Sequence, residues 1–423
     1  MDTFDEINIL HLSDVHYGIG AYKGPTQDRH QKWIMRGILN TLADNEMVSE
    51  KWKPDVVLIT GDIAFSGQAE EYKKFKECFL KPLLDILKID ISRVLICPGN
   101  HDVDRNVVKS IINDIRNAEE PYKTKCVSRI RPDKDKWPLN GVLGIEGSDE
   151  RKIRNKPFNN FIKELCDDDA TRLVRLVKFK EWPWVNFILL NSAWDCYNDD
   201  DCGRLRVGLD SLEELVDKTN VDKEIAVVGL HHPVGSFNER LVDGTFKVVE
   251  WLHCSERLTQ KELTFEGFLT RNVDYIFSGH MHIHHNVRSI GDRAIQFISA
   301  ANYSDDVSSY EFRIVKLKKD DEPDYIQFES KLSDVSPSEL IPWDRKSKLS
   351  DLRRIRKYKK FKKNDRLQVD LNNQQELAKF IDGLFQKAIY KYFEKATFVQ
   401  ANTLTKKLIP DSENNDNNTE GGI

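Results

Sequence analysis

The stretch PGNHDVD (residues 98–104) directly follows the apolar run RVLIC (residues 93–97). Such a run has the length and composition of a buried strand, and a Pro-Gly-Asn turn can end it. A turn alone does not require His101 and Asp102 behind Asn100, because these side chains bind metals or move protons. The stretch therefore predicts a functional corner at the end of a strand.

Short apolar runs of strand length recur along the chain. They are rich in Val and Ile and alternate little, which is typical of strands covered on both faces. They read INILHLS (7–13), DVVLIT (55–60), RVLIC (93–97), VNFILL (185–190), IAVVGL (225–230), DYIFS (274–278) and AIQFIS (294–299). Between the first three lie two segments with apolar residues at helical spacing, 28–45 and 70–87. This alternation predicts an α/β fold with parallel strands and helical crossovers.

The composition is that of an ordinary globular protein of the cytoplasm. Charged residues make up 31% of the 423 residues, and no apolar run approaches the roughly 18 residues that a membrane helix needs. The first ten residues, MDTFDEINIL, have neither the basic nor the apolar region of a secretory signal. The seven cysteines show no CxxC spacing, so we expect reduced thiols, a cytoplasmic location and no membrane association.

Polar side chains follow five of the apolar runs, at the ends where sites form in α/β sheets. They are Asp14 and His16 in HLSDVH, Asp62 in LITGD, Asn100, His101 and Asp102 in CPGNHD, His231 and His232 in GLHHP, and His280 and His282 in SGHMH. Carboxylate, imidazole and amide groups without a thiolate favour divalent ions such as Mn²⁺, Zn²⁺, Fe²⁺ or Ni²⁺. The repeated placement of such residues predicts a metal site.

The same residues have a spacing that suits two metals. His280 and His282 project to the same side of an extended segment. Asp62 can bridge two cations with its two oxygens. Two metals about 3.5–4 Å apart would clamp the attacking and leaving oxygens of an in-line phosphoryl displacement.

The blocks DVH, GD, GNHD, HHP and GHMH, in this order between residues 14 and 282, resemble the calcineurin-like metallophosphoesterase superfamily. The resemblance covers about residues 7–315. It implies an α/β fold with a four-layer αββα sandwich of two sheets flanked by helices, and a binuclear metal centre. The run TGDIAFSGQAEEY (60–72) is similar in style to bacterial class III cyclic-nucleotide phosphodiesterases and to metallophosphoesterase domains fused to bacterial NTPase sensors.

The resemblance also implies a role for each site residue. One metal would bind Asp14, His16 and His282, the other Asn100, His231 and His280, and Asp62 would bridge them. His101 would act as general acid or contact the substrate phosphate. The metals would be two divalent ions, with Mn²⁺ preferred and Fe, Zn, Ni or Mg as alternatives, and the reaction would be attack of a metal-bridging hydroxide on phosphorus.

Phe65 and Asp102 lie close in the sequence to the expected site residues. Some branches of the family place an Asp three residues after the bridging Asp, where it supports the catalytic His, but here that residue is Phe65. The partner of His101 is therefore open. Asp102 is expected to orient a histidine or to cap the next helix.

We expect three regions in the chain. They are a catalytic domain over 1–335 with an insertion or cap at 104–180, a basic helical extension over 336–410, and a disordered tail over 411–423. Residues 345–366 hold 12 basic and 2 acidic side chains. Residues 374–393 carry a broad apolar stripe at helical spacing.

Three functions are compatible with these features. The first is a phosphodiesterase acting on nucleotides or nucleic acid. The second is a DNA or RNA nuclease whose basic segment 345–366 holds the substrate; the same segment could instead be a solvated helix or bind an acidic partner. The third is a non-catalytic adaptor that uses the apolar stripe at 374–393 to bind a protein partner or a second copy of itself.

Overall fold

The structure of the chain is a computed structural model. It describes residues 3–108, 153–166, 172–194, scattered positions between 196 and 219, 224–240, 246–252, 265–282, 286–290, 294–303, 309–331 and 344–346. The chain divides into two compact units, residues 1–360 and 361–423, and all described residues belong to the first. The middle of the expected insertion, most of the basic segment 345–366, the stripe at 374–393 and the tail lie outside the described residues.

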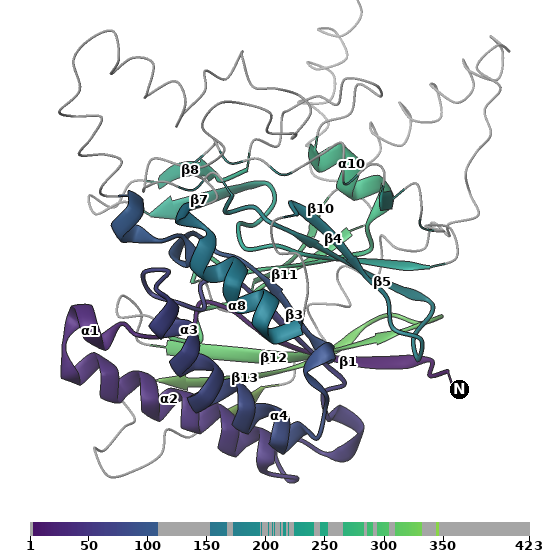
Figure 1. Cartoon of the computed structure of the whole chain (residues 1–423). Helices are drawn as coiled ribbons and strands as arrows, with labels where there is room; N and C mark the ends of the chain where they lie inside the picture. Colours follow the sequence, from purple (N-terminus) through teal and green to yellow (C-terminus); the bar gives the residue numbers. More distant parts are fainter. Residues whose placement is uncertain are drawn as a thin grey trace, which may run out of the picture. The chain divides into compact units, whose positions relative to one another are not determined.

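The elements follow one another in the order strand, helix, strand over the first hundred residues and become rich in strands afterwards (Figure 1). They are β1 (Glu6–Leu12), α1 (Gly20–Lys23), α2 (Pro25–Ala43), η1 (Glu50–Trp52), β2 (Val56–Thr60), α3 (Ala69–Phe75), the π-helical turn η2 (Lys76–Leu80), α4 (Lys81–Leu87), η3 (Ile91–Arg93), β3 (Val94–Cys97), η4 (Asn100–Asp102), α8 (Lys156–Cys166), β4 (Val174–Val177), β5 (Val185–Leu190), β6 (Ile225–Gly229), β7 (Ser236–Arg240), β8 (Phe246–Glu250), α10 (Phe265–Asn272), β9 (Tyr275–Ser278), β10 (Asn286–Ile290), β11 (Ala294–Ile298), β12 (Ser309–Lys318), β13 (Asp324–Lys331) and β14 (Asp344–Lys346).

In the part of the chain that the structure describes, the strands form two six-stranded sheets and one hairpin. The first sheet has the order β14-β13-β12-β1-β2-β3, and the second has the order β10-β11-β9-β6-β5-β4. Both are mixed: β1, β2 and β3 are parallel, and so are β5, β6, β9 and β11, whereas the remaining pairs are antiparallel. Strands β7 and β8 pair only with each other among the described strands.

The two sheets pack face to face over an apolar core. Ile7 and Ile9 of β1 share this core with Phe277 of β9 and Phe297 of β11. On the outer face of the second sheet, Phe268 of α10 packs in a separate cluster with residues of β6 and β9. Because side chains alternate between the faces of a strand, one sheet serves two cores.

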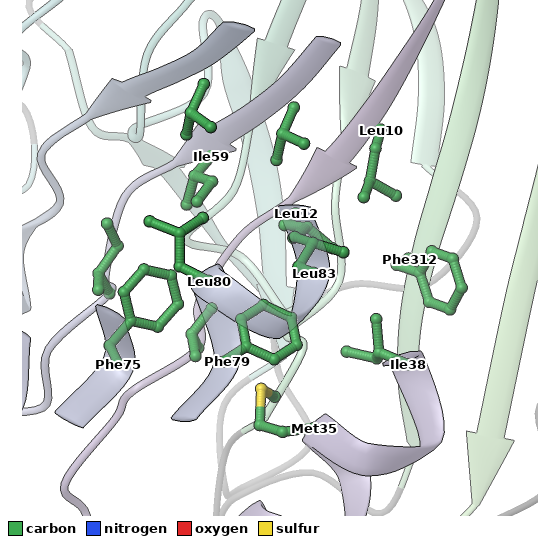
Figure 2. Close-up of a cluster of buried hydrophobic side chains, with 14 of the residues drawn as sticks. Leu10, Leu12, Met35, Ile38, Ile59, Phe75, Phe79, Leu80, Leu83 and Phe312 are labelled. Atoms are coloured by element: carbon green, nitrogen blue, oxygen red, sulfur yellow. The ribbon is translucent and has the colours of Figure 1, made fainter. Parts of the chain in front are cut away.

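The outer face of the first sheet is covered by α2, α3, α4 and α8 (Figure 1). Figure 2 shows Leu10 and Leu12 of β1 directed toward Phe79 and Leu83 of the helical layer, with Met35 of α2 beside them. These side chains are all at most 4% exposed, so the cluster holds the helices on the strands through burial of apolar area. Helix, sheet, sheet and helix give the four-layer αββα sandwich that the resemblance implied.

All the apolar runs quoted above are strands, and both helix-period segments are helical. The second segment is not one regular helix, because the π-helical turn Lys76–Leu80 separates α3 from α4. The helical piece FNNFIKELC (158–166) of the expected insertion lies in α8, and its apolar residues pack in the cluster of Figure 2. Strand β14 pairs with β13, so the first sheet includes residues beyond the expected boundary at 335.

Strands β12 and β13 have charged side chains that point into the protein. Arg313 and Glu311 are both fully buried and form an ion pair. The guanidinium of Arg313 also donates to the carbonyl of Ile298 in the second sheet at 2.8 Å, and Gln327 Nε2 donates to Glu311 Oε2 at 2.9 Å. This network therefore links the two sheets and pairs two buried charges, since an unpaired buried charge would be costly.

Among the described helices, none combines the length and the apolar character needed to cross a membrane.

Candidate metal centre

The candidate site lies where parallel strands of both sheets end. Strands β1, β2 and β3 run parallel in the first sheet, as do β6 and β9 in the second. The expected site residues are Asp14 and His16 after β1, Asp62 after β2, Asn100 and His101 after β3, His231 after β6, and His280 and His282 after β9. The structure brings these side chains together from both sheets.

Asp14, His16 and His282 form the first group of expected ligands. Asp14 Oδ1 lies 3.2 Å from His282 Nε2, and one ligand atom of each residue lies within 4.8 Å of the others. The backbone amide of His280 donates to both carboxylate oxygens of Asp14, at 3.2 and 3.1 Å. The loops of the two sheets are thereby joined, and three donor atoms converge as a divalent cation requires.

Asn100, His231 and His280 form the second group. Asn100 Oδ1 lies 3.0 Å from His231 Nε2 and 3.1 Å from His280 Nδ1. The two imidazole nitrogens are 3.1 Å apart. The indole of Trp251 lies edge to face against His280 with ring centroids 4.1 Å apart, which limits the rotation of that imidazole.

Asp62 lies between the two groups. Its Oδ2 is 3.1 Å from His16 Nε2 of the first group and 3.4 Å from His231 Nε2 of the second. Its Oδ1 accepts a hydrogen bond from the backbone amide of His101 at 2.8 Å. We expected the two oxygens to serve one metal each; instead, a single oxygen faces both groups because the other is held by the backbone.

The chemistry of these atoms fits cations. His231 Nδ1 donates to the carbonyl of Thr60 at 2.8 Å. When the ring is neutral, its Nε2 therefore carries a lone pair that faces Asn100 Oδ1 and Asp62 Oδ2, which are acceptors as well. Burial opposes protonation of His231, but the carboxylates of Asp62 and Asp14 outweigh it and raise its pKa. Burial likewise opposes ionisation of Asp62, yet the imidazoles of His231 and His101 hold its pKa well below the usual range. The centre thus favours positive charge among its acceptors, which divalent cations would supply.

The backbone is strained at the expected ligands. Six non-glycine residues in the described ranges have a positive φ, and five of them are expected ligands: Asp14 (54°), His16 (49°), Asp62 (53°), His280 (71°) and His282 (50°). The sixth, Lys88, ends helix α4. The left-handed region costs an L-residue about 1–2 kcal/mol. Strain concentrated at one constellation indicates a functional site rather than a set of ordinary turns.

Glycines let the ligand loops approach one another. A Cβ on Gly279 would lie 1.9 Å from Ser13 Oγ and 2.4 Å from Asp14 Oδ2. A Cβ on Gly99 would lie 2.1 Å from Asp62 Oδ1, and one on Gly61, whose φ is +97°, would lie 2.7 Å from His231 Nδ1. The glycines before Asp62, Asn100 and His280 are therefore required by space, and Gly61 also by its backbone conformation.

We expected Asp102 to orient a histidine or to cap the next helix, but its carboxylate instead caps the short 3-10 helix η4 in which it lies. Its carboxylate accepts hydrogen bonds from the amides of Ala64 at 3.0 Å and Gly99 at 2.9 Å and from the hydroxyl of Tyr72 at 3.0 Å. Burial, reinforced by the charge of Asp62, raises the pKa of Asp102 to about 7. Asp102 therefore joins the loops after β2 and β3 and anchors both to helix α3.

Two further residues position the loop after β1, and sequence reasoning missed both. Gln31 of α2 donates through Nε2 to the carbonyls of Val15 and His16, at 2.8 and 2.7 Å. Asn302 accepts from the amide of Ser13 at 3.0 Å. Neither lies near a ligand in the sequence, and no local pattern distinguishes them from other amides.

His101 has a backbone partner. Its Nδ1 lies 2.7 Å from the carbonyl of Phe65 and donates to it, so Phe65 supplies with its backbone what an Asp side chain supplies elsewhere in the resembling family. The imidazole of His101 lies 4.6 Å from that of His16. Burial, together with the charges of His16 and Arg105, lowers the pKa of His101 to about 4 even though Asp62 opposes this. His101 is therefore neutral near pH 7 in the free protein, with Nε2 available as an acceptor.

The remaining histidines differ in their surroundings. His232, which is not among the expected ligands, lies 3.0 Å from Ser192 Oγ through Nδ1, although its ring is also 4.5 Å from that of His280. His11 is buried between the sheets with Nε2 3.0 Å from Thr60 Oγ1. His284 and His285 lie outside the described residues.

Comparison with known proteins identifies the family of the chain. The family model of the calcineurin-like phosphoesterases matches residues 7–284. The chain belongs to this family. The matched range includes every candidate ligand of this phosphoesterase, from Asp14 to His282.

Individual proteins resemble the chain over a short segment or at low sequence identity. A probable glycerophosphodiester phosphodiesterase (GpdQ) of Arcobacter nitrofigilis is 46% identical over 57 residues, which are 14% of this chain and 18% of that protein. A predicted phosphoesterase of Streptococcus pneumoniae TIGR4 has 8% identity and a TM-score of 0.27, over 82% of this chain and 100% of its own. The sulfate thiohydrolase SoxB of Thermus thermophilus has 12% identity and a TM-score of 0.32, over 75% of this chain and 55% of its own.

We predict that Gly279→Ala removes most of the bound metal, because the new methyl group would displace Asp14 and Ser13. Metal content after dialysis, measured by elemental analysis, checks this. Gly24→Ala is the control for backbone strain away from the centre, because Gly24 has a φ of +106° but its Cβ would meet no atom closer than 3.9 Å. A Gly279→Ala protein that is folded and keeps the metal content of the wild type would contradict the role of the close approach.

Proposed function

We propose that this phosphoesterase is a metal-dependent phosphodiesterase that acts on nucleotides or nucleic acid, with two divalent cations in the candidate centre. The observation that carries the proposal is the position of Asp62 Oδ2, 3.1 Å from His16 Nε2 and 3.4 Å from His231 Nε2. One carboxylate oxygen shared by two groups of donors is the geometry expected of a two-metal site.

The residues would divide the work as follows. Asp14, His16 and His282 would hold one cation, Asn100, His231 and His280 the other, and Asp62 both. Bound cations would supply charge neutralisation at the phosphate and a water of lowered pKa. The chain itself fixes the donor positions through Gln31, Asn302 and Asp102, whose hydrogen bonds hold the loops after β1, β2 and β3.

His101 would handle the proton of the leaving group. Its Nδ1–H is held by the carbonyl of Phe65, so a proton exchanged with the substrate would reside on Nε2. Because the pKa is lowered to about 4 in the free protein, action as a general acid requires that the negative charge of the substrate raise this pKa before the leaving oxygen departs.

Mn²⁺ is the metal we propose, with Fe, Zn, Ni or Mg as alternatives. The donor set combines carboxylates, imidazoles and one amide oxygen and contains no thiolate. Such a set suits borderline and hard divalent ions, and the Asn100 oxygen adds a ligand without adding charge.

A diester is favoured over a monoester by two observations. The 57-residue relative is named as a probable glycerophosphodiester phosphodiesterase. The run TGDIAFSGQAEEY is similar to that of cyclic-nucleotide phosphodiesterases, and in this chain it forms a closed loop in which Glu71 accepts from the amides of Ser66 at 3.1 Å and Gln68 at 2.9 Å. The basic segment 345–366 supports the nuclease alternative, which needs the same centre.

We predict that Asp62→Asn lowers Mn²⁺-dependent hydrolysis of bis-(p-nitrophenyl) phosphate by at least about 10²-fold, because the shared oxygen loses its charge. Initial rates and metal content at matched Mn²⁺ concentrations measure the effect. Asp85→Asn, which removes one charge from an exposed position of α4, is the control. Equal rates in wild type and Asp62→Asn would overturn the proposed function.

A second prediction separates metal binding from proton transfer. His101→Asn should keep the metals and lose roughly 10²–10⁴ in rate on a substrate with an alkoxide leaving group, the usual worth of general acid catalysis. The loss on bis-(p-nitrophenyl) phosphate should be smaller, because p-nitrophenolate needs little protonation.

His280→Asn is the matched comparison. It should lose metal and slow both substrates alike, since its Nδ1 belongs to the second donor group. If His101→Asn also loses metal, or slows both substrates equally, then His101 is not the general acid.

A further inference from the structure

An aromatic residue is exposed beside the candidate centre. In the described ranges the exposed large hydrophobic side chains are Phe4, Tyr22 and Ile153, and Tyr22 is 49% exposed. Tyr22 lies in α1, on the segment that follows the ligands Asp14 and His16. A single exposed ring is common on protein surfaces, so its surroundings decide whether it has a function.

Tyr22 continues a row of rings that begins at the centre. The imidazole of His101 is 5.4 Å from the ring of Phe65, with 38° between the planes. Phe65 in turn is 5.3 Å from Tyr22, with 41° between the planes. Phe65 is only partly buried, with one side packed on the apolar cluster of the helical layer. The row therefore runs from the expected proton donor outward to solvent.

The Tyr22 ring is held in place. Its hydroxyl lies 2.5 Å from Ser66 Oγ, and Ser66 Oγ donates to the buried carboxylate of Glu71 at 2.9 Å. Glu71 also packs against Gly18, where an added Cβ would lie 2.7 Å from Glu71 Cγ. An exposed ring with a fixed orientation loses little conformational entropy when a ligand stacks on it.

We propose that Tyr22 and Phe65 form a stacking surface for a nucleobase of the substrate, on the side of the centre where His101 lies. This inference rests on the proposed function and specifies the substrate class. Because Phe65 lies 5.4 Å from His101 and 5.3 Å from Tyr22, a base one ribose away from a phosphate beside His101 would meet these rings. Stacking on aromatic side chains recognises any base through its flat face.

The geometry favours a planar group over a quaternary ammonium group. A choline headgroup is bound in a cage of aromatic faces that surround the cation. Tyr22 and Phe65 are instead neighbours in one row, inclined by 41°, and the outer ring, Tyr22, is 49% exposed. A glycerophosphocholine-like ligand is therefore the competing outcome of the test.

Binding of products tests the inference without depending on turnover. Calorimetric titration of the full chain with Mn²⁺ present would compare three ligands: AMP, ribose 5-phosphate, which lacks the base, and phosphocholine. For the wild type we expect AMP to bind roughly tenfold or more tighter than ribose 5-phosphate, the usual contribution of one stacked base. In Tyr22→Leu and in Phe65→Leu this ratio should fall toward one.

Tyr22→Phe is the matched control, because it keeps the ring and removes only the hydroxyl that contacts Ser66. It should keep most of the wild-type ratio. Circular dichroism confirms that each variant is folded, and Phe65→Leu retains the carbonyl that holds His101.

The outcomes separate the inference from the proposed function. If ribose 5-phosphate binds as tightly as AMP in the wild type, or if the ratio survives in both Leu variants, the stacking surface is refuted while the phosphodiesterase stands. If phosphocholine is the ligand that depends on Tyr22, the surface serves another substrate class and the inference is equally refuted. If the wild type binds none of the three and hydrolyses no diester, the proposed function fails together with it.

Discussion

The meeting of buried acceptor atoms from two sheets around Asp62 Oδ2 is the constraint on which the rest of the structure depends. Loops after β1, β2 and β3 of one sheet and after β6 and β9 of the other must approach within hydrogen-bond distance, as the 3.0 Å separation of Asn100 Oδ1 and His231 Nε2 shows. The apolar core between the sheets fixes that approach. Gly61, Gly99 and Gly279 leave the space for it. Positive φ angles at five candidate ligands are its local cost.

The strained loops are stabilised by residues outside the set of candidate ligands. Asp102 accepts from amides on two of the loops, and Gln31 holds the carbonyls beside His16. These contacts preorganise the donors before any cation arrives, as an efficient metal site requires. The same loop of residues 62–66 carries the carbonyl that orients His101 and the ring of Phe65, so the expected proton handling and the proposed base recognition share one support.

Much of the centre could be predicted from sequence because its signals are local. Each candidate ligand follows closely behind an apolar run, as Asp62 does behind DVVLIT, so the strand and the candidate site were recognised together. Strands β12 and β13 escaped recognition because charged residues interrupt their apolar pattern, and the burial of Glu311 and Arg313 depends on partners such as Gln327 and Ile298 that are distant in the sequence.

Contacts between residues that are distant in the sequence also determine the features of the site that could not be predicted. Asp62 directs only Oδ2 at both donor groups because its Oδ1 accepts a hydrogen bond from the amide of His101, 39 residues later. The bracing role of Asn302 depends on Ser13, 289 residues earlier. Asp102 caps its own turn through the amide of Gly99, but its bond to the amide of Ala64, 38 residues earlier, could not be predicted from its neighbours in the sequence.

The central claim is that two cations share Asp62, and the most direct measurement is an anomalous difference map from crystals of the protein grown with Mn²⁺. The account predicts two peaks about 3.5–4 Å apart. One should contact Asp14, His16 and His282, the other Asn100, His231 and His280, with Asp62 Oδ2 between them. A single peak, or two peaks of which one lies away from Asp62, would contradict it.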